Sequence, residues 1–477
     1  MTAAPEDVRL ETSIGTALVA GLAAWSIPGH IPGLNFVLTG VAAAAVVLVA
    51  RRGRVWWPAA AMSLLLVGFP VVRAAEWLLV PNFMMAVALG AFAVVDARTW
   101  RTLTRIPFEG IAAGLRGPAV LIRPLRSSLG SLAPEAVWPA LRGTVAAVFL
   151  LVIFGGLFLS ADAAFARLTA DVILPSWTVE LFPARVIIFA GGFVTVAALL
   201  VLPQRLAGAG DADPWSRDRR PWQRVEWIVA LGALNLLFLA FVVVQLAVLF
   251  GGRTHVLTTA GVTYAHYARQ GFFQLVAVAA LVLGVVAYTM TGADTSDPRD
   301  RIWLRALLGT LCVLTLVVLA SALRRLELYE DAYGFTRLRL LVHAAILWIG
   351  IILALLLIAG AIWKSRWLPS ALIIVTGGAF GVFNLINPDA TVARENIERF
   401  ERTGRIDTAY LATLSEDAVP ALTALPEEKR ACLVPAITGR NPRDGSLFAF
   451  NLSRVAAAHL VAREELQEGG TGCMYRL

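Results

Sequence analysis

The sequence predicts an all-α fold, a polytopic transmembrane helix bundle of about eleven spans followed by a small helical C-terminal domain. Hydrophobic residues make up 58% of the 477 residues and charged residues only 16%, whereas soluble domains have about 45–50% and about 25%. A water-soluble globule with so few charges would expose large apolar patches. Long apolar stretches recur along the first 387 residues, and charged residues become frequent beyond them.

Each predicted span is an apolar stretch of the length that a helix needs to cross hydrocarbon, roughly 17–25 residues. In lipid, backbone polar groups must be satisfied within the segment, so helices are expected rather than strands. No cleavable signal is expected at the start, because acidic residues outnumber basic ones there. The candidate spans lie near 12–27, 34–50, 55–72, 77–95, 138–160, 182–203, 225–249, 270–290, 303–322, 340–361 and 369–387.

Basic residues predict the orientation of the bundle. Alternate loops form two sets, one with 20 arginines and lysines and the other with 8. The richer set is expected to be cytoplasmic, which places the N-terminus inside and, with eleven spans, the C-terminal domain outside. The basic excess thus follows topology, and no nucleic-acid partner is expected.

The longest cytoplasmic loop, residues 97–137, alternates arginines with apolar residues such as Ile111 and Leu115. Such a segment can lie in the headgroup layer and attract anionic lipid. The simpler interpretation, a topology anchor, is favoured because basic clusters beside spans are common.

The last ninety residues, 388–477, hold 13 acidic and 11 basic residues and are predicted to form a water-facing helical domain. Ser415 is expected to cap a helix that runs through Leu422 and Leu425. Cys432 and Cys473 both fall in this domain, on the side where oxidation is permitted. We expect a disulfide between them; the alternative is two unrelated thiols.

No phosphate loop, HExxH, CxxC or GxSxG motif is present, so no cofactor is predicted and a non-catalytic role is favoured over an enzyme. His255 and His266 lack a diagnostic ligand spacing, and no metal site is assigned.

Two short exterior segments, residues 263–273 and 324–339, are the candidate ligand-binding surface. The second, residues 324–339, is expected to be a helical hairpin with Gly334 as the helix stop and Thr336 as the next start. Its four arginines could bind a phosphate, carboxylate or lipid headgroup, or could pair internally with Glu327, Glu330 and Asp331. The internal pairing is favoured. The candidate ligand-binding residues are Tyr264, His266, Tyr267, Arg269, Arg325, Tyr329, Asp331 and Arg337.

Several separated phrases resemble bacterial membrane proteins of domain-of-unknown-function family 4173, which overlaps with the related family 4153. The phrases are TYAHYARQGFFQL, LYEDAYGFTRLRL, LFLSADAAFARL ending at Leu168, NPDATVARENI and LSEDAVPAL. The resemblance implies a many-span protein of the bacterial plasma membrane, and brings no reaction, ligand or catalytic residue.

Two functions remain open. The first is a cell-envelope binding, transport or partner-scaffold role of the outer face, with membrane lipid, a lipid headgroup or an envelope protein as partner. The second is a membrane enzyme that acts on a lipid-linked substrate at the extracytoplasmic face. Its candidate residues would be Asp162, His266, Arg269, Glu330, Asp331 and Arg337.

Overall fold

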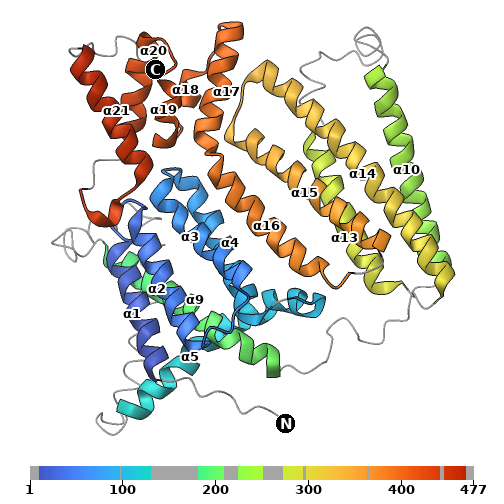
Figure 1. Ribbon diagram of the computed structural model, residues 1–477, viewed down its shortest axis with the longest axis horizontal. Coiled ribbons are helices and arrows are strands. Elements are labelled where there is room, and N and C mark those ends of the chain that lie inside the picture. Colours follow the sequence, from blue (N-terminus) through green and yellow to red (C-terminus); the bar gives the residue numbers. More distant parts are fainter. Residues whose placement is uncertain are drawn as a thin grey trace, which may run out of the picture. The chain divides into compact units, whose positions relative to one another are not determined.

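A computed structural model describes residues 10–96, 98–129, 181–208, 224–250, 272–293, 297–362, 365–440 and 445–468. Regular structure in these ranges consists of helices (Figure 1), which confirms the all-α prediction. The chain divides into two compact units. The first comprises Met1–Asp96, Thr104–Gly210 and Asn441–Leu452, and the second comprises Ala97–Leu103, Asp211–Arg440 and Ser453–Leu477.

In its described ranges, the first unit is built on four consecutive apolar helices and a later fifth one. These are α1 (Leu10–Ser26), α2 (Leu34–Ala50), α3 (Trp57–Val72), α4 (Leu79–Val95) and α9 (Phe182–Gly208). Neighbours in sequence pack together, and α9 packs against α1, α2 and α4. The amphipathic helix α5 (Trp100–Leu129) contributes Leu121 to the core that these helices share.

Where the structure describes it, the second unit contains five apolar helices and the segment that follows them. The apolar helices are α10 (Arg224–Phe250), α13 (Phe272–Gly292), α14 (Pro298–Tyr333), α15 (Arg337–Ile362) and α16 (Leu368–Leu385). Helix α14 is central, since α10, α13 and α15 all pack against it. Asp297 caps its start by accepting a hydrogen bond from the backbone N–H of Arg299 at 2.8 Å.

Among the described residues, six helices are long and apolar enough to cross a membrane, namely Glu76–Val95, Ala184–Ala207, Arg224–Gln245, Pro298–Tyr333, Arg337–Ile362 and Leu368–Leu385. Shorter apolar helices occupy several of the other predicted spans, and the predicted span at 138–160 lies outside the described residues. The chain is therefore a multi-pass membrane protein. Helix α14 has 36 residues and is about 54 Å long at about 1.5 Å per residue, so it exceeds a hydrocarbon core of about 30 Å.

Shorter helices follow α16. They are α17 (Pro388–Thr403), α18 (Thr408–Leu411), α19 (Val419–Leu422) and α20 (Glu427–Thr438), and α21 (Leu452–Glu468) comes last. The prediction of a single helix after Ser415 is wrong. Residues 416–418 form a 3₁₀ turn, α19 is only one turn long, and the Ser415 hydroxyl bonds to Asp417 and does not cap a helix.

Candidate functional site

Four of the eight predicted ligand-binding residues, Tyr264, His266, Tyr267 and Arg269, lie outside the described residues. The other four lie around the turn between α14 and α15. This turn forms as expected: Gly334 ends α14 with a φ of 83°, and α15 begins at Arg337. The Thr336 hydroxyl oxygen accepts a hydrogen bond from the backbone N–H of Arg339 at 3.4 Å, as a helix start requires.

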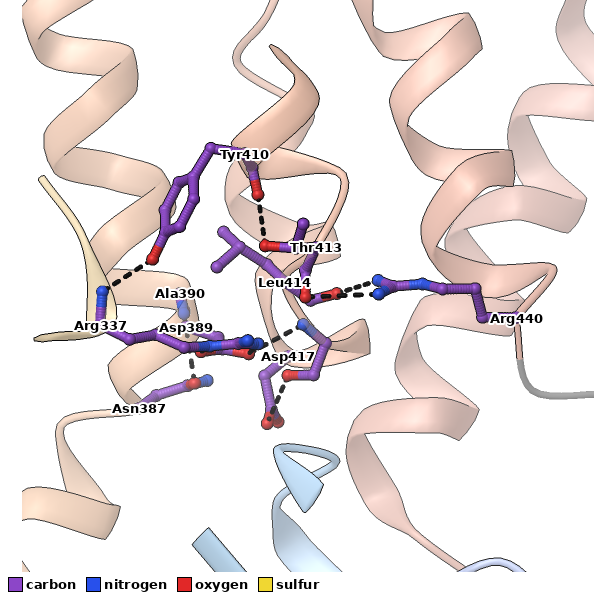
Figure 2. Close-up of polar contacts among 10 residues, drawn as sticks. Arg337, Asn387, Asp389, Ala390, Tyr410, Thr413, Leu414, Asp417 and Arg440 are labelled. Carbon is purple, nitrogen blue, oxygen red and sulfur yellow. Dashed lines mark hydrogen bonds and ion pairs between the residues drawn. The ribbon is translucent and has the colours of Figure 1, made fainter. Parts of the chain in front are cut away.

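Arg337 makes the central contact of the site, an ion pair with Asp389 of α17 (Figure 2). Arg337 Nε donates to Asp389 Oδ1 at 2.7 Å and Nη2 donates to Oδ2, so both carboxylate oxygens are engaged. Asp389 is fully buried, whereas the Arg337 side chain is 26% exposed. Such a two-point geometry fixes direction as well as distance, which a single-point pair does not.

The local sequence places Asp389 at the start of α17. Asn387 caps this helix by accepting from the Ala390 N–H at 3.4 Å, and Pro388 occupies the first helical position. Asp389 therefore lies in the first turn, where the helix dipole favours negative charge. Its Oδ2 also accepts a hydrogen bond from the backbone N–H of Ser415 at 2.8 Å.

These contacts outweigh the cost of burial for Asp389. Burial alone would raise the pKa of this carboxyl, but the bonds from Arg337 and Ser415 hold the pKa below its ordinary value. Asp389 is thus held as the charged form that Arg337 requires. Burial likewise raises the pKa of nearby Tyr410, whose hydroxyl stays neutral and accepts a hydrogen bond from the Arg337 backbone N–H at 2.8 Å.

The loop between α18 and α19 packs behind this pair. The Ser415 hydroxyl bonds to Asp417 Oδ2 at 3.2 Å, and both side chains are buried. Arg440, which follows the end of α20 (Glu427–Thr438), donates to the carbonyl oxygens of Thr413 and Leu414 (Figure 2). Arg440 therefore holds the backbone that carries the Ser415 N–H.

A second set of bonds ties α17 to the α14–α15 turn. Arg399 donates through Nε to the carbonyl of Asp331 at 3.1 Å and through Nη2 to the carbonyl of Ala332 at 2.9 Å. Asn396 bonds to the backbone of Phe335. The Asp331 side chain, a predicted ligand group, is exposed.

The remaining predicted residues point elsewhere. Arg325 donates to Gln245 Oε1 of α10 at 2.8 Å, within the helix bundle. Tyr329 packs beneath the Arg339 guanidinium, 4.2 Å from the ring centroid, and beside the Tyr333 ring at 4.9 Å. The structure thus does not gather Arg325, Tyr329, Asp331 and Arg337 around one point.

Glu330 and His343 form a separate acid–imidazole pair. His343 Nδ1 lies 3.4 Å from Glu330 Oε1 and 3.1 Å from the Arg339 carbonyl oxygen, and the Phe335 ring stacks on the imidazole at 5.9 Å. Glu330 Oε1 is buried and makes no hydrogen bond to any residue that the structure describes. This pair is the described feature best suited to acid–base work.

The described part of the chain has no group of three or more His, Cys, Asp or Glu side chains that could hold a metal ion. The Arg337–Asp389 network can join segments firmly, because its polar groups bond to one another and its carboxylate is inaccessible. The Asp389 carboxylate is therefore not accessible to a substrate.

Sequence reasoning missed Asp389 and Tyr410, which bond to Arg337, and it also missed Ser415, which bonds to Asp389, and Asn396. A usable signal existed: the phrases LYEDAYGFTRLRL, NPDATVARENI and LSEDAVPAL supply Arg337, Asp389 with Asn396, and Ser415. Those phrases meet at this network. Cys473 lies outside the described residues, so the Cys432–Cys473 disulfide stays a prediction.

Comparison with known proteins identifies a family. The family model described as domain of unknown function (DUF4153) matches residues 60–425, which is more than half of the chain. The expected relation to family 4153 is confirmed. No curated protein and no solved structure matches the chain.

Proposed function

This chain belongs to the DUF4153 family, and we propose that it is a cell-envelope membrane protein whose α17–α20 segment is a rigid platform for a protein partner. The observation that carries the proposal is the fully buried Asp389, held by Arg337 on one side and by the Ser415 N–H on the other. A carboxylate enclosed in this way positions helices and does not act on a substrate.

The outer face of α17 supports a protein partner. Arg394, Glu398, Glu401 and Arg402 are exposed and lie on one face of the helix at spacings of three and four residues. Both signs of charge are present on this face, whereas a site for a single anion would be uniformly basic. Mixed charges of this kind select a protein surface by complementarity.

Rigid attachment makes this face suitable for binding. The α17 helix is joined to the α14–α15 turn by an ion pair from Arg337 and by hydrogen bonds from Arg399 and Asn396. A partner therefore meets a preformed surface and does not have to order it, which lowers the entropy cost of association. The loop charges favour the extracytoplasmic side for this platform.

The alternative, a membrane enzyme for a lipid-linked substrate, is favoured by one observation, the Glu330–His343 pair. A buried carboxyl beside an imidazole is the kind of pair that transfers protons in catalysis. It would act without the Asp389 network, so the two functions can be separated by mutation.

The test places a photo-crosslinking residue on the proposed platform in living cells. We expect Glu398→p-benzoylphenylalanine to give a discrete protein adduct, and the same replacement of Leu237, an exposed apolar residue of α10, to give none. The partner would then be purified and bound to the reconstituted protein. Asp389→Asn should weaken that binding by about tenfold or more, since the platform loses its support.

Two results would count against the platform. One is partner binding that Asp389→Asn leaves unchanged. The other is loss of cellular function in Glu330→Gln or His343→Gln with partner binding intact, which would favour the enzyme.

A further inference from the structure

Helix α5 (Trp100–Leu129) is unlike the apolar helices around it. It carries several arginines and is not among the helices apolar enough to cross a membrane. Figure 1 shows α5 running across α1, α2 and α9 rather than alongside them. Its residues from Thr104 onward belong to the first unit.

One face of α5 is packed against α9. Ala113 and Leu121 are fully buried, and Leu121 shares a core with Val196 and Val201 of α9. Gly117 permits a close approach, because a Cβ there would lie 3.0 Å from the carbonyl carbon of Ala197. Across the same interface, Arg205 Nε bonds to Glu109 Oε2 at 2.9 Å. These contacts fix the rotation of α5 about its own axis.

A second face of α5 is apolar and exposed. Phe108, Ile111, Leu115 and Ile122 follow one another at spacings of three, four and seven residues, which aligns them along one side of a helix. Their exposed fractions are 71%, 67%, 80% and 43%. Four large apolar side chains in one row are too many for a surface in contact with water.

A third face is basic. Arg116 and Arg123 are both exposed and stand seven residues apart, so they project on the same side of α5, next to the apolar row. Arg105, eleven residues before Arg116, lies on the same side of the helix. An exposed apolar row flanked by arginines matches the boundary between acyl chains and anionic headgroups.

We propose that α5 lies in the headgroup layer of the membrane and binds anionic phospholipid. Phe108, Ile111, Leu115 and Ile122 enter the acyl region, and Arg116 and Arg123 contact headgroup phosphates. Charge complementarity selects this occupant, because a second copy of this chain would bring its own arginines to the same surface. Contacts to α9 hold the helix at a fixed depth, so this attachment is part of the bundle and not a loose tether.

The apolar face can be tested with the full chain in nanodiscs of phosphatidylcholine and phosphatidylglycerol. Under irradiation, Leu115→p-benzoylphenylalanine should form a covalent adduct with phospholipid, detected by mass spectrometry of the α5 peptide. Leu237 of α10, which is 66% exposed, is the positive control, and Glu427, an exposed residue of the α20 first turn, is the negative control. An adduct between Leu115 and a protein peptide, or no adduct, would overturn the proposal.

The basic face has a matched control within the same unit. The Arg116→Gln/Arg123→Gln double variant should lower the preference of the protein for spin-labelled phosphatidylglycerol over phosphatidylcholine by about fivefold or more. Arg52→Gln/Arg54→Gln removes the same charge from exposed positions between α2 and α3. This control variant should change the preference for phosphatidylglycerol by less than about twofold. Equal losses in the two variants would mean that the arginines of α5 only contribute to overall charge, and would overturn specific binding by α5.

Discussion

The Asn396 side chain forms two hydrogen bonds with the backbone of Phe335, one to its carbonyl and one from its N–H. Its Nδ2 donates to the Phe335 carbonyl at 2.8 Å, and its Oδ1 accepts from the Phe335 N–H at 3.1 Å. Nδ2 also donates to the carbonyl of Val392 at 2.8 Å. One amide side chain thereby satisfies the backbone of the residue that follows the α14 stop.

This pairing couples Asn396 to Gly334. Gly334 has a φ of 83°, and a Cβ there would lie 2.7 Å from Asn396 Oδ1. We expect Gly334→Ala to destabilise the protein by about 1 kcal/mol through its backbone conformation, with a further cost from the clash. Asn396→Ala should cost about 2 kcal/mol because the Phe335 backbone loses its partner.

A double-mutant cycle separates the two costs. In Gly334→Ala/Asn396→Ala the clash disappears, so the total loss should be smaller than the sum of the single losses. Thermal melting of the detergent-solubilised protein measures the loss of stability in each single variant and in the double variant. Strict additivity would show that the contact between the two residues carries no energy.

Removing one partner of the Arg337–Asp389 pair should destabilise the protein more than replacing both partners with apolar residues. Asp389→Asn leaves the half-buried Arg337 without its countercharge, and we expect a loss of about 3 kcal/mol. Arg337→Met/Asp389→Leu removes both charges and should be less destabilising than Asp389→Asn alone, since no buried charge is left unpaired. Hydrogen exchange of the α17 amides and thermal melting would show which of the two variants is the less stable. If the double variant proved the less stable, the ion pair would itself be a net source of stability.

The α14–α15 turn could be predicted because its signals are local. A glycine with positive φ ends one helix and a threonine begins the next, and both features lie within three residues of sequence. The same holds for most apolar helices, whose length and composition alone determine that they are helices.

The charge partners could not be predicted, because they depend on tertiary packing. Arg324 does pair within the hairpin, with Glu327 at 3.0 Å. Arg337 instead reaches Asp389, 52 residues later in the chain, and Arg325 reaches Gln245, 80 residues earlier. Nothing in the sequence near Arg337 distinguishes Asp389 from the closer carboxylates Glu330 and Asp331. Only the packing of α17 against α15 decides it.

The predicted Cys432–Cys473 disulfide has a direct test. Cys312 is buried in α14, so in the folded protein it should react slowly with a thiol reagent. Without reductant, the native protein should therefore incorporate almost no label, and reduction should add two labels. Cys432→Ser is the control, because it should free one reactive thiol. Two labels in the unreduced wild type would contradict the disulfide.

Acid should release α17 from the α14–α15 turn at a pH set by Asp389. Its pKa is below the ordinary value in the folded protein and returns to about 4 when the contact opens, so the open state binds more protons in acid. The stabilisation is fully present above the ordinary pKa and is lost as the pH falls through the lower, folded value. Below both values the two states are equally protonated and the contribution vanishes.

Hydrogen exchange of the α17 and Ser415 amides, corrected for intrinsic rates, would follow this loss between about pH 7 and pH 2. Wild type should keep its protection down to the ordinary carboxyl range and lose it below. Asp389→Asn should be weakly protected at every pH and should lack this step, because the amide does not titrate. A wild-type profile parallel to that of Asp389→Asn would assign acid sensitivity to other carboxylates and remove Asp389 as the group that holds the platform.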